Sequence, residues 1–434
     1  MSYERRVLVH HSLASMVALG ITGLARLLYS ILIARRFGVE ILGLANSIIS
    51  QSFLLAIPLS FFAVALGKYS SEFLGRNREE SIRAITLPSF LLPLAGLVLL
   101  PFNAYMALLA VFRGIQLTLR GFLYGIHRGE HYAYIISVAF LGFLAGFLLP
   151  NPLAPYLMFL GVVSALAWVY LLRFRLVGRP CGEELKLIAS YSAFAFLGTL
   201  SGVFLIQGPY FMSERLSGAE VAGVVSAVLS TVFLLTYLPQ VLQSAIMPLF
   251  SYKYGKNERD YIRRLAEEST IFLLVVTSTT VFALMLFGRE LLSLVFDFRI
   301  GPSFYIALMA IEVYIAYNPS IVALNSTSYV KHATAVSLTG AAVALISWLS
   351  FIPRFEDVGV MVGLLLAYAS ILAGVALLSK RFLGVSPSIY SHLFISLLLQ
   401  AAVFVSKSLL LVGFIAFLAY EWKNIRRMIS LFRS

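Results

Sequence analysis

The chain has 434 residues, of which 60% are hydrophobic and only 12% are charged, and its mean hydropathy is +0.90. One soluble core cannot bury that much apolar surface, so the composition indicates an all-α polytopic membrane protein. The formal charge of +13 would suit a nucleic-acid-binding protein, but in a membrane chain the placement of charge decides its meaning. The single cysteine, Cys181, excludes an internal disulfide framework and a cysteine-only metal site.

Apolar runs of about 17 to 25 residues predict fourteen transmembrane helices, because a helix can satisfy its own backbone hydrogen bonds in hydrocarbon. The first run follows Glu4, Arg5 and Arg6 directly and lacks a small-residue cleavage site, so we expect it to be retained rather than removed as a signal peptide. The expected spans are residues 9–33, 41–66, 84–101, 104–126, 132–149, 153–172, 187–208, 220–248, 269–288, 303–326, 332–352, 358–379, 389–406 and 408–422.

The basic residues favour one side of these spans. With the N-terminus in the cytoplasm, 23 of the 33 lysines and arginines lie in cytoplasmic segments, 7 lie outside and 3 lie within the spans. Lysine and arginine are enriched in cytoplasmic loops of membrane proteins. The chain is therefore expected to be a multi-pass cell-membrane protein with both termini in the cytoplasm, and its positive charge to be a topology signal.

A long internal repeat divides the chain. Residues 38–83 match residues 218–263 without a gap, and thirteen of the 46 positions are identical, Gly38 with Gly218 among them. Six expected spans separate equivalent points, and an even number places the two halves parallel in the membrane. We expect an N-lobe of residues 1–180, a C-lobe of residues 181–382, and an appended helix pair with a cytoplasmic tail at residues 383–434.

The sequence offers little for catalysis. It contains no GxxxxGK[ST], HExxH or GxSxG motif, and no stretch outside the expected spans exceeds about 20 residues. His10 and His11 adjoin the first span, where they are more typical of the membrane interface than of a metal site. We expect a transporter without catalytic residues or bound metal. The enzymatic alternative, a membrane-embedded glycosyltransferase, would need acidic residues in an outward loop, such as Asp297 or the pair at 356–357.

Three arginines lie inside the expected spans: Arg26, Arg113 and Arg120. A buried arginine costs a few kcal/mol, so it normally faces a wet cavity or a partner. Arg113, Gln116 and Arg120 share one face of the fourth span. These four side chains are our candidates for binding a phosphate or pyrophosphate. Two alternatives stay open, since Arg120 lies near the cytoplasmic end and can snorkel, and Arg26 can pair with an acidic neighbour.

Polar side chains of two other spans complete the candidate site. Asn46, Ser50 and Gln51 of the second span are expected to line the cavity. Glu312 lies in the tenth span, and a buried carboxylate there can exchange a proton or ligate sodium, so it is a candidate for coupling transport to H⁺ or Na⁺. The open alternative is that Glu312 is a counter-ion for Arg26 or Arg113 across the cleft.

Two segments resemble a known family. Residues 34–77, ARRFGVEILGLANSIISQSFLLAIPLSFFAVALGKYSSEFLGRN, resemble the opening of polysaccharide-biosynthesis flippases of the multidrug/oligosaccharidyl-lipid/polysaccharide (MOP) exporter superfamily. Residues 238–265, LPQVLQSAIMPLFSYKYGKNERDYIRRL, are similar to a C-lobe segment of that family. The resemblance implies two six-helix lobes in a V that flip a polyprenyl-(pyro)phosphate-linked oligosaccharide to the outer leaflet by alternating access. It also implies cavity arginines for the lipid phosphate, with Arg26 most similar in role, although the C-lobe spans hold no arginine.

The alternative within the same superfamily is a cation-coupled multidrug exporter of the multidrug and toxin extrusion branch. A cavity for cationic drugs should be acidic, whereas the expected spans hold three arginines and one candidate glutamate, so the sequence favours the flippase. The partners we expect are a polyprenyl-linked glycan and membrane lipid, with the chain acting as a monomer and without nucleic acid.

Overall fold

The computed structural model describes residues 3–433, and each regular element in that range is a helix. The side chains of residues 3–12, with those of His10 and His11, lie outside the described part. The chain divides into two compact units, unit 1 from Met1 to Arg215 and unit 2 from Leu216 to Ser434. The division lies 35 residues beyond the expected lobe boundary at residue 180, because α8 (Gly182–Ser217) falls almost entirely within unit 1.

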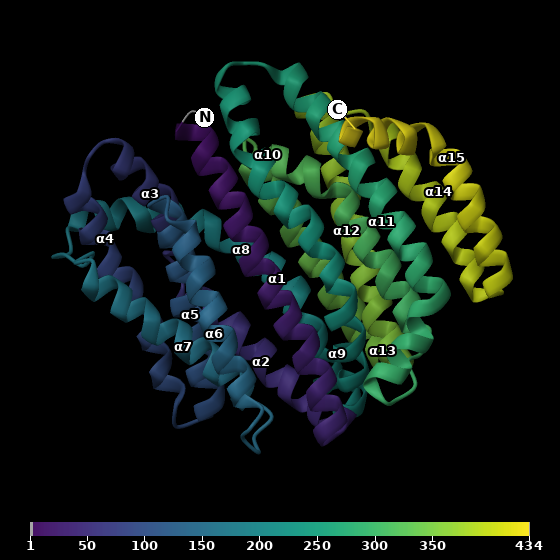
Figure 1. Ribbon diagram of the computed structural model, residues 1–434, viewed down its shortest axis with the longest axis horizontal. Coiled ribbons are helices and arrows are strands. Elements are labelled where there is room, and N and C mark those ends of the chain that lie inside the picture. Colours follow the sequence, from purple (N-terminus) through teal and green to yellow (C-terminus); the bar gives the residue numbers. More distant parts are fainter. Residues whose placement is uncertain (1–2, 434) are drawn as a thin grey trace. The chain divides into compact units, whose positions relative to one another are not determined.

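Unit 1 is a bundle of helices joined by short turns (Figure 1). The 3-10 element that follows α4 begins with Leu92 and Pro93, where proline removes a backbone donor and interrupts the α-helical pattern. The elements of unit 1, besides α8, are α1 (Tyr3–Phe37), α2 (Val39–Leu59), α3 (Ala63–Gly75), α4 (Glu79–Leu91), η1 (Leu92–Leu99), α5 (Ala104–Gly125), α6 (Gly129–Gly146) and α7 (Ala154–Arg173).

Glycines fix the position of α5, the helix that carries two of the three span arginines. A Cβ added at Gly121 would collide with the carbonyl oxygen of Ala63 on α3, and one added at Gly125 would lie 2.5 Å from that of Gly67. The two glycines are four residues apart, the small-residue spacing that lets helix backbones meet in membranes. The direct backbone approach of α3 and α5 sets the register of the helix that holds Arg113.

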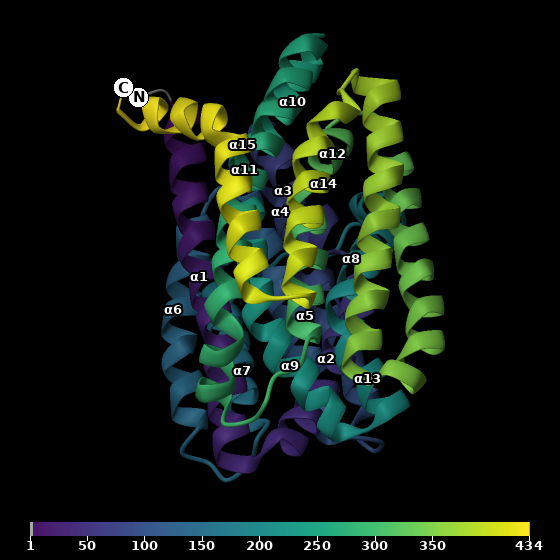
Figure 2. The same cartoon turned by 90° about the vertical axis from the view of Figure 1, so that its right-hand side faces the viewer.

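Unit 2 contains the remaining helices (Figure 2). α13 is a helical hairpin, because Glu356 has non-helical dihedrals between its two halves, which correspond to the expected spans 332–352 and 358–379. Trp348 Nε1 donates to the carbonyl of Val360 at 3.0 Å and ties the halves together. The elements of unit 2 are α9 (Ala219–Val232), η2 (Phe233–Thr236), α10 (Tyr237–Gly255), α11 (Arg259–Phe296), α12 (Ser303–Asn325), α13 (Val330–Leu383), η3 (Pro387–Tyr390), α14 (Ser391–Gln400), η4 (Ala401–Phe404) and α15 (Lys407–Arg433).

The all-α membrane class is confirmed. Among the described residues, twelve helical segments are long and apolar enough to cross a membrane, and α13 is one of them although it carries two expected spans. The remaining expected span, 132–149, corresponds to α6, which has 18 residues. The appended pair forms Pro387–Phe404 and Lys407–Arg427, both of spanning length. The fourteen expected spans therefore each have a helical counterpart.

The sequence repeat is also a repeat of the backbone. Both copies begin at a glycine with positive φ, 91° at Gly38 and 97° at Gly218, and L-residues rarely adopt that conformation. Both copies end a helix before a left-handed asparagine, Asn77 with φ 56° and Asn257 with φ 61°. Equivalent helix ends in the two copies are 180 residues apart. α2 starts at residue 39 and α9 at residue 219, and α3 ends at residue 75 and α10 at residue 255. The identical glycines and asparagines are therefore the turn residues of a duplicated unit.

Candidate functional site

The first candidate arginine lies where α1 meets α8 in unit 1. Arg26 donates a hydrogen bond from Nη2 to the hydroxyl of Tyr210, and its guanidinium carbon lies 5.1 Å from the centroid of that ring. Tyr210 is 2% exposed, and Arg26 is half-buried. The guanidinium of arginine is a permanently charged group with five N–H donors. Arg26 therefore brings a fixed positive charge to the α1–α8 contact.

The second candidate arginine rests on an aromatic ring. The guanidinium carbon of Arg113, on α5, lies 4.6 Å from the ring centroid of Phe53 on α2. Arg113 Nη1 donates to Gln116 Oε1 at 2.5 Å, and Gln116 is 1% exposed. The amide oxygen of Gln116 therefore holds the arginine in place. Stacking leaves the edge of the guanidinium plane, where its N–H groups point, as the side suited to binding an anion.

Aromatic rings connect the two arginines. Tyr29 follows Arg26 by three residues on α1, and its ring packs edge-on against Tyr156 of α7 with centroids 4.8 Å apart. Tyr156 in turn packs against Phe53 at 6.0 Å, and Phe53 supports Arg113. Tyr29, Tyr156, Phe53 and Arg113 thus form one packed series, and Arg26 lies one turn before Tyr29 on α1. We call these five residues the arginine cluster.

The polar residues of α2 make contacts across helices. Ser50 Oγ donates to Gln207 Oε1 of α8 at 3.0 Å, in a buried contact. Gln51 Nε2 donates to Ser47 Oγ one turn earlier at 3.1 Å. The amide nitrogen of Asn46 is buried and has no hydrogen-bond partner among the described residues. A buried unsatisfied donor is costly, so Asn46 marks a place where a polar ligand would be stabilised.

Arg120 is placed differently from Gln116, the residue one turn before it. Gln116 is buried, whereas Arg120 is exposed near the C-terminal end of α5. Tyr132 of α6 lies close enough to interact electrostatically with both Arg120 and Arg113. Arg113, Gln116 and Arg120 all lie on α5, as their spacing in the sequence requires for a shared helix face. The exposure of Arg120 fits the snorkelling alternative.

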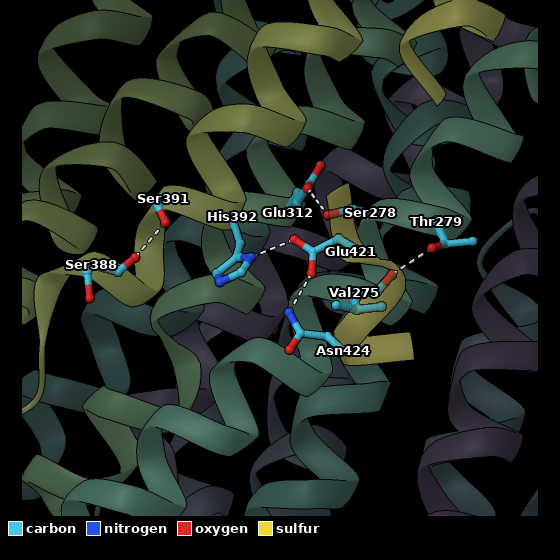
Figure 3. Close-up of polar contacts among 9 residues, drawn as sticks. All are labelled: Val275, Ser278, Thr279, Glu312, Ser388, Ser391, His392, Glu421 and Asn424. Carbon is cyan, nitrogen blue, oxygen red and sulfur yellow. Dashed lines mark hydrogen bonds and ion pairs between the residues drawn. The ribbon is translucent and has the colours of Figure 1, made fainter. Parts of the chain in front are cut away.

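Glu312 lies on α12 in unit 2 and is fully buried. Ser278 of α11 donates to its Oε1, and Gln400 Nε2 of α14 donates to its Oε2 at 2.5 Å (the Ser278 contact is drawn in Figure 3). Gln400 also donates to Ser396 Oγ at 2.8 Å. These uncharged donors solvate the carboxylate within its own unit. The sequence analysis missed all three, although Gln400 and Ser396 carried a signal as polar residues in an apolar run.

A second buried carboxylate lies between α14 and α15. Glu421 is fully buried, and its Oε1 lies 2.5 Å from His392 Nδ1 (Figure 3). Asn424 Nδ2 donates to Glu421 Oε2 at 2.8 Å. The sequence analysis did not single out this group, because Glu421 lies at the very end of the last expected span and His392 near the start of the one before it.

The two units therefore present different chemistry. The arginine cluster and the unsatisfied amide of Asn46 offer hydrogen-bond donors and positive charge, which suit an anion such as a phosphate. The carboxylates of unit 2 suit a proton or a cation. The described residues contain no group of three or more histidine, cysteine, aspartate or glutamate side chains placed to hold a metal ion.

Comparison with known proteins agrees with this architecture. Residues 209–353, about a third of the chain, match the MatE family model. The fold is similar to that of the lipid II flippase MurJ in its inward closed conformation, with a TM-score of 0.66 and 12% identity over 95% of this chain and 99% of the other. A search of curated protein sequences finds no match.

Multidrug transporters share the fold as well. An outward-facing multidrug resistance MATE transporter of the MOP superfamily has a TM-score of 0.58 and 13% identity, over 90% of this chain and 98% of that one. A point mutant of the Vibrio cholerae MATE transporter VcmN has a TM-score of 0.59 and 13% identity, over 89% of this chain and 98% of that one. The MatE match covers a third of the chain, and these structural likenesses, all below 25% identity, show that the chain has the fold of these membrane transporters.

Proposed function

We propose that this protein is a flippase that moves a polyprenyl-(pyro)phosphate-linked oligosaccharide from the cytoplasmic to the outer leaflet by alternating access. In this proposal the sugar and phosphate cross in a polar cleft while the prenyl chain stays in lipid. The chain acts as a monomer in the cell membrane with both termini in the cytoplasm, and the polar cargo avoids the hydrocarbon core.

The observation that carries the proposal is the pair of guanidinium groups fixed against aromatic rings inside unit 1. Arg26 is fixed by Tyr210, and Arg113 by Phe53 and Gln116. Arginine binds phosphate oxygens through its planar fork of N–H donors, and such contacts are stronger away from bulk water. Side chains already held in place lose less conformational entropy when the ligand binds.

Other polar groups of unit 1 extend the proposed site. The buried amide nitrogen of Asn46 would donate to a phosphate or sugar oxygen, and Ser50 and Gln51 would line the path. Arg120, exposed at its end of α5, would attract the anionic headgroup before it enters the cleft. These roles stay within the chemistry of hydrogen-bond donation to an anion.

Glu312 is the residue we propose for coupling to H⁺ or Na⁺. It is fully buried, and its partners Ser278 and Gln400 are uncharged. An ionisable residue inside a membrane bundle is a candidate for ion coupling, because its charge state changes the cost of burial. Loading and release of an ion at Glu312 would then shift the equilibrium between the inward-open and outward-open conformations.

A cation-coupled multidrug exporter is the second candidate function. It is favoured by the MatE match at residues 209–353, which includes Glu312, and by the buried carboxylates of unit 2. A carboxylate in a membrane bundle suits a cationic ligand as well as a coupling ion. On this alternative the arginine cluster would be structural.

Transport in proteoliposomes separates the two. The purified protein would be reconstituted with a labelled polyprenyl-pyrophosphate oligosaccharide, and its appearance in the opposite leaflet followed over time. We expect Arg26→Ala and Arg113→Ala each to slow translocation about 10- to 100-fold, because the free energy of one hydrogen bond to a charged group corresponds to about that factor. Arg76→Ala is the matched control, because Arg76 is exposed and pairs only with Glu72 one turn away at 2.7 Å among the ion pairs described.

Undiminished translocation by both variants would contradict the proposed site. Efflux of a cationic dye by the wild-type protein, with no movement of the labelled lipid, would select the exporter instead.

A further inference from the structure

One face of α14 carries a line of polar side chains. His392, Ser396 and Gln400 are spaced four residues apart, so each lies about 6 Å further along the helix than the one before it. Ser396 and Gln400 are fully buried, whereas the His392 side chain is 17% exposed. Polar groups inside an apolar bundle are costly unless they bond to one another or serve a path for ions or protons.

The line joins the two buried carboxylates of unit 2. At one end His392 bonds to Glu421 of α15, and at the other Gln400 bonds to Glu312 of α12. The hydroxyl of Ser396 accepts from the same amide nitrogen of Gln400 that donates to Glu312, which places Ser396 beside that carboxylate. Figure 3 shows His392 directed at Glu421 and, deeper in the view, Ser278 at Glu312.

We propose that this face of α14 is a proton path that connects the His392–Glu421 pair to Glu312. The exposed end of the path lies at the end of the helix pair that we expect to face the cytoplasm, where Lys423 and Arg427 follow Glu421. The appended pair would thus supply the proton entry for a coupling residue on α12. The inference rests on the proposed coupling role of Glu312 and is independent of the cargo.

Each step transfers one proton without breaking a heavy-atom bond. His392 takes a proton from water at the exposed end of the path. Its Nδ1–H donates to the carboxylate of Glu421, which only accepts hydrogen bonds, so Nε2 is the nitrogen that exchanges a proton with water. A water between the turns carries the proton to Ser396 Oγ, whose own proton passes to Glu312. The net change is one proton lost by the water at the exposed end and one gained by Glu312, while His392, the bridging water and Ser396 return to their starting states. Gln400 is a positioning residue, because its amide nitrogen is the donor to both Glu312 and Ser396.

The charged and titratable groups around this line of side chains lie mainly near its His392 end. At Glu312 the contacting side chains are the uncharged Ser278, Ser396 and Gln400. The groups near the other end are the Glu268–Arg427 ion pair between α11 and α15 at 2.8 Å, Glu267 of α11 bonded to the backbone of Ser386, Tyr390 of η3 bonded to Ser320, and Tyr420, whose ring centroid lies 5.5 Å from that of His392.

The test is infrared spectroscopy of the full chain in lipid nanodiscs, with no transport substrate. The carbonyl band of protonated Glu312 is identified by its loss in Glu312→Gln, and the rate of its isotope shift is followed after a switch from H2O to D2O at acidic pH. We expect His392→Leu and Ser396→Ala each to slow the exchange at least tenfold. Ser396→Thr keeps the hydroxyl and should restore the rate. His332→Leu, a histidine substitution on α13, is the matched control and should leave the rate unchanged.

Equal exchange rates in the wild-type protein and in both His392→Leu and Ser396→Ala would overturn the path, as would the absence of any protonated Glu312 band down to the lowest pH at which the protein stays folded. Thermal melting of each variant shows whether it is folded, so that a slow exchange rate is not caused by misfolding. Because no lipid-linked cargo is present, a failed result here leaves the arginine test in unit 1 untouched, and the reverse also holds.

Discussion

Unit 1 and unit 2 each contain one copy of the backbone repeat, but their buried polar groups differ in charge and in the helices to which they bond. In unit 1, Ser50 of α2 bonds across to Gln207 of α8. At the equivalent position of unit 2, Ser230 of α9 bonds to the carbonyl of Ala227 in its own helix at 3.0 Å. The hydroxyl of Ser50 thus links two helices, whereas that of Ser230 bonds within its own helix. The duplicated helices therefore share a framework but differ in the contacts of their buried polar side chains.

The charges differ in the same way. Unit 1 carries Arg26 and Arg113 within its expected spans, and unit 2 carries the buried carboxylates of Glu312 and Glu421. This contrast is the basis of our proposal that unit 1 binds an anionic cargo and unit 2 exchanges an ion. Substitutions in each unit test these separate roles.

The largest expected effect is on coupling. Glu312→Gln keeps the size and hydrogen-bonding capacity of the side chain but cannot take up a proton or balance a cation. We expect gradient-driven translocation in proteoliposomes to fall at least 100-fold, while binding of a polyprenyl pyrophosphate changes by less than about twofold. A parallel loss of binding would show that the two units do not divide the work as proposed.

Arg113→Lys should have the next largest effect. Lysine keeps the charge but loses the planar fork and the stacking on Phe53, so we expect binding of the phosphate lipid to weaken about tenfold. Isothermal titration with polyprenyl phosphate would measure it. Binding equal to that of the wild type would mean that charge alone matters and that the ring contact has no part in recognition.

A matched pair of substitutions compares the same position in the two copies. Phe53→Leu removes the ring under Arg113, a contact worth about 0.5–1 kcal/mol at a partly exposed site, and should weaken phosphate-lipid binding about two- to fivefold. Phe233 occupies the equivalent position of the repeat in unit 2, so Phe233→Leu should leave binding unchanged. Equal effects of the two variants on binding would assign the loss to general destabilisation.

The smallest expected effect is a pH dependence of stability in unit 1. The side chain of Cys181 and the backbone N–H of Glu184 hold the pKa of the Glu184 carboxyl below its usual range, with Ser81 and Arg78 acting in the same direction. A depressed pKa in the folded state adds stability at neutral pH, and that stability is lost as the pH falls through the folded value.

Glu184→Gln should therefore lower Tm by about 1–2 °C at pH 7, and the difference from the wild type should vanish as the pH falls through the lowered pKa of Glu184. Glu183→Gln, one residue earlier and exposed, is the control and should show no such pH dependence. A difference that stays constant across this pH range would contradict the role of the Glu184 charge.

The sequence predicted the helices well because membrane spans follow from apolar length. The repeat aligned Gly38 with Gly218, but only the structure shows that both have positive φ. It placed Arg113 and Gln116 on one face, but it could not show that Gln116 would accept from Arg113, since spacing along a helix does not give the direction of a hydrogen bond. Phe53 and Tyr210 were missed because an aromatic residue in an apolar span carries no signal until its neighbour is known.

The partners of Glu312 were missed for a related reason. Ser278 and Gln400 lie on helices far from α12 in sequence, and a single sequence does not reveal which faces of separate helices meet. The exposure of Arg120 depends on the depth of α5 in the bundle, which the glycine contacts with α3 set through tertiary packing.

The most direct test of the central claim is binding of polyprenyl pyrophosphate to the purified protein, measured by native mass spectrometry for the wild type and the Arg26→Ala/Arg113→Ala double variant. The account predicts saturable binding by the wild type and at least about 100-fold weaker binding by a double variant that remains folded. Equal affinity of the two proteins would contradict it.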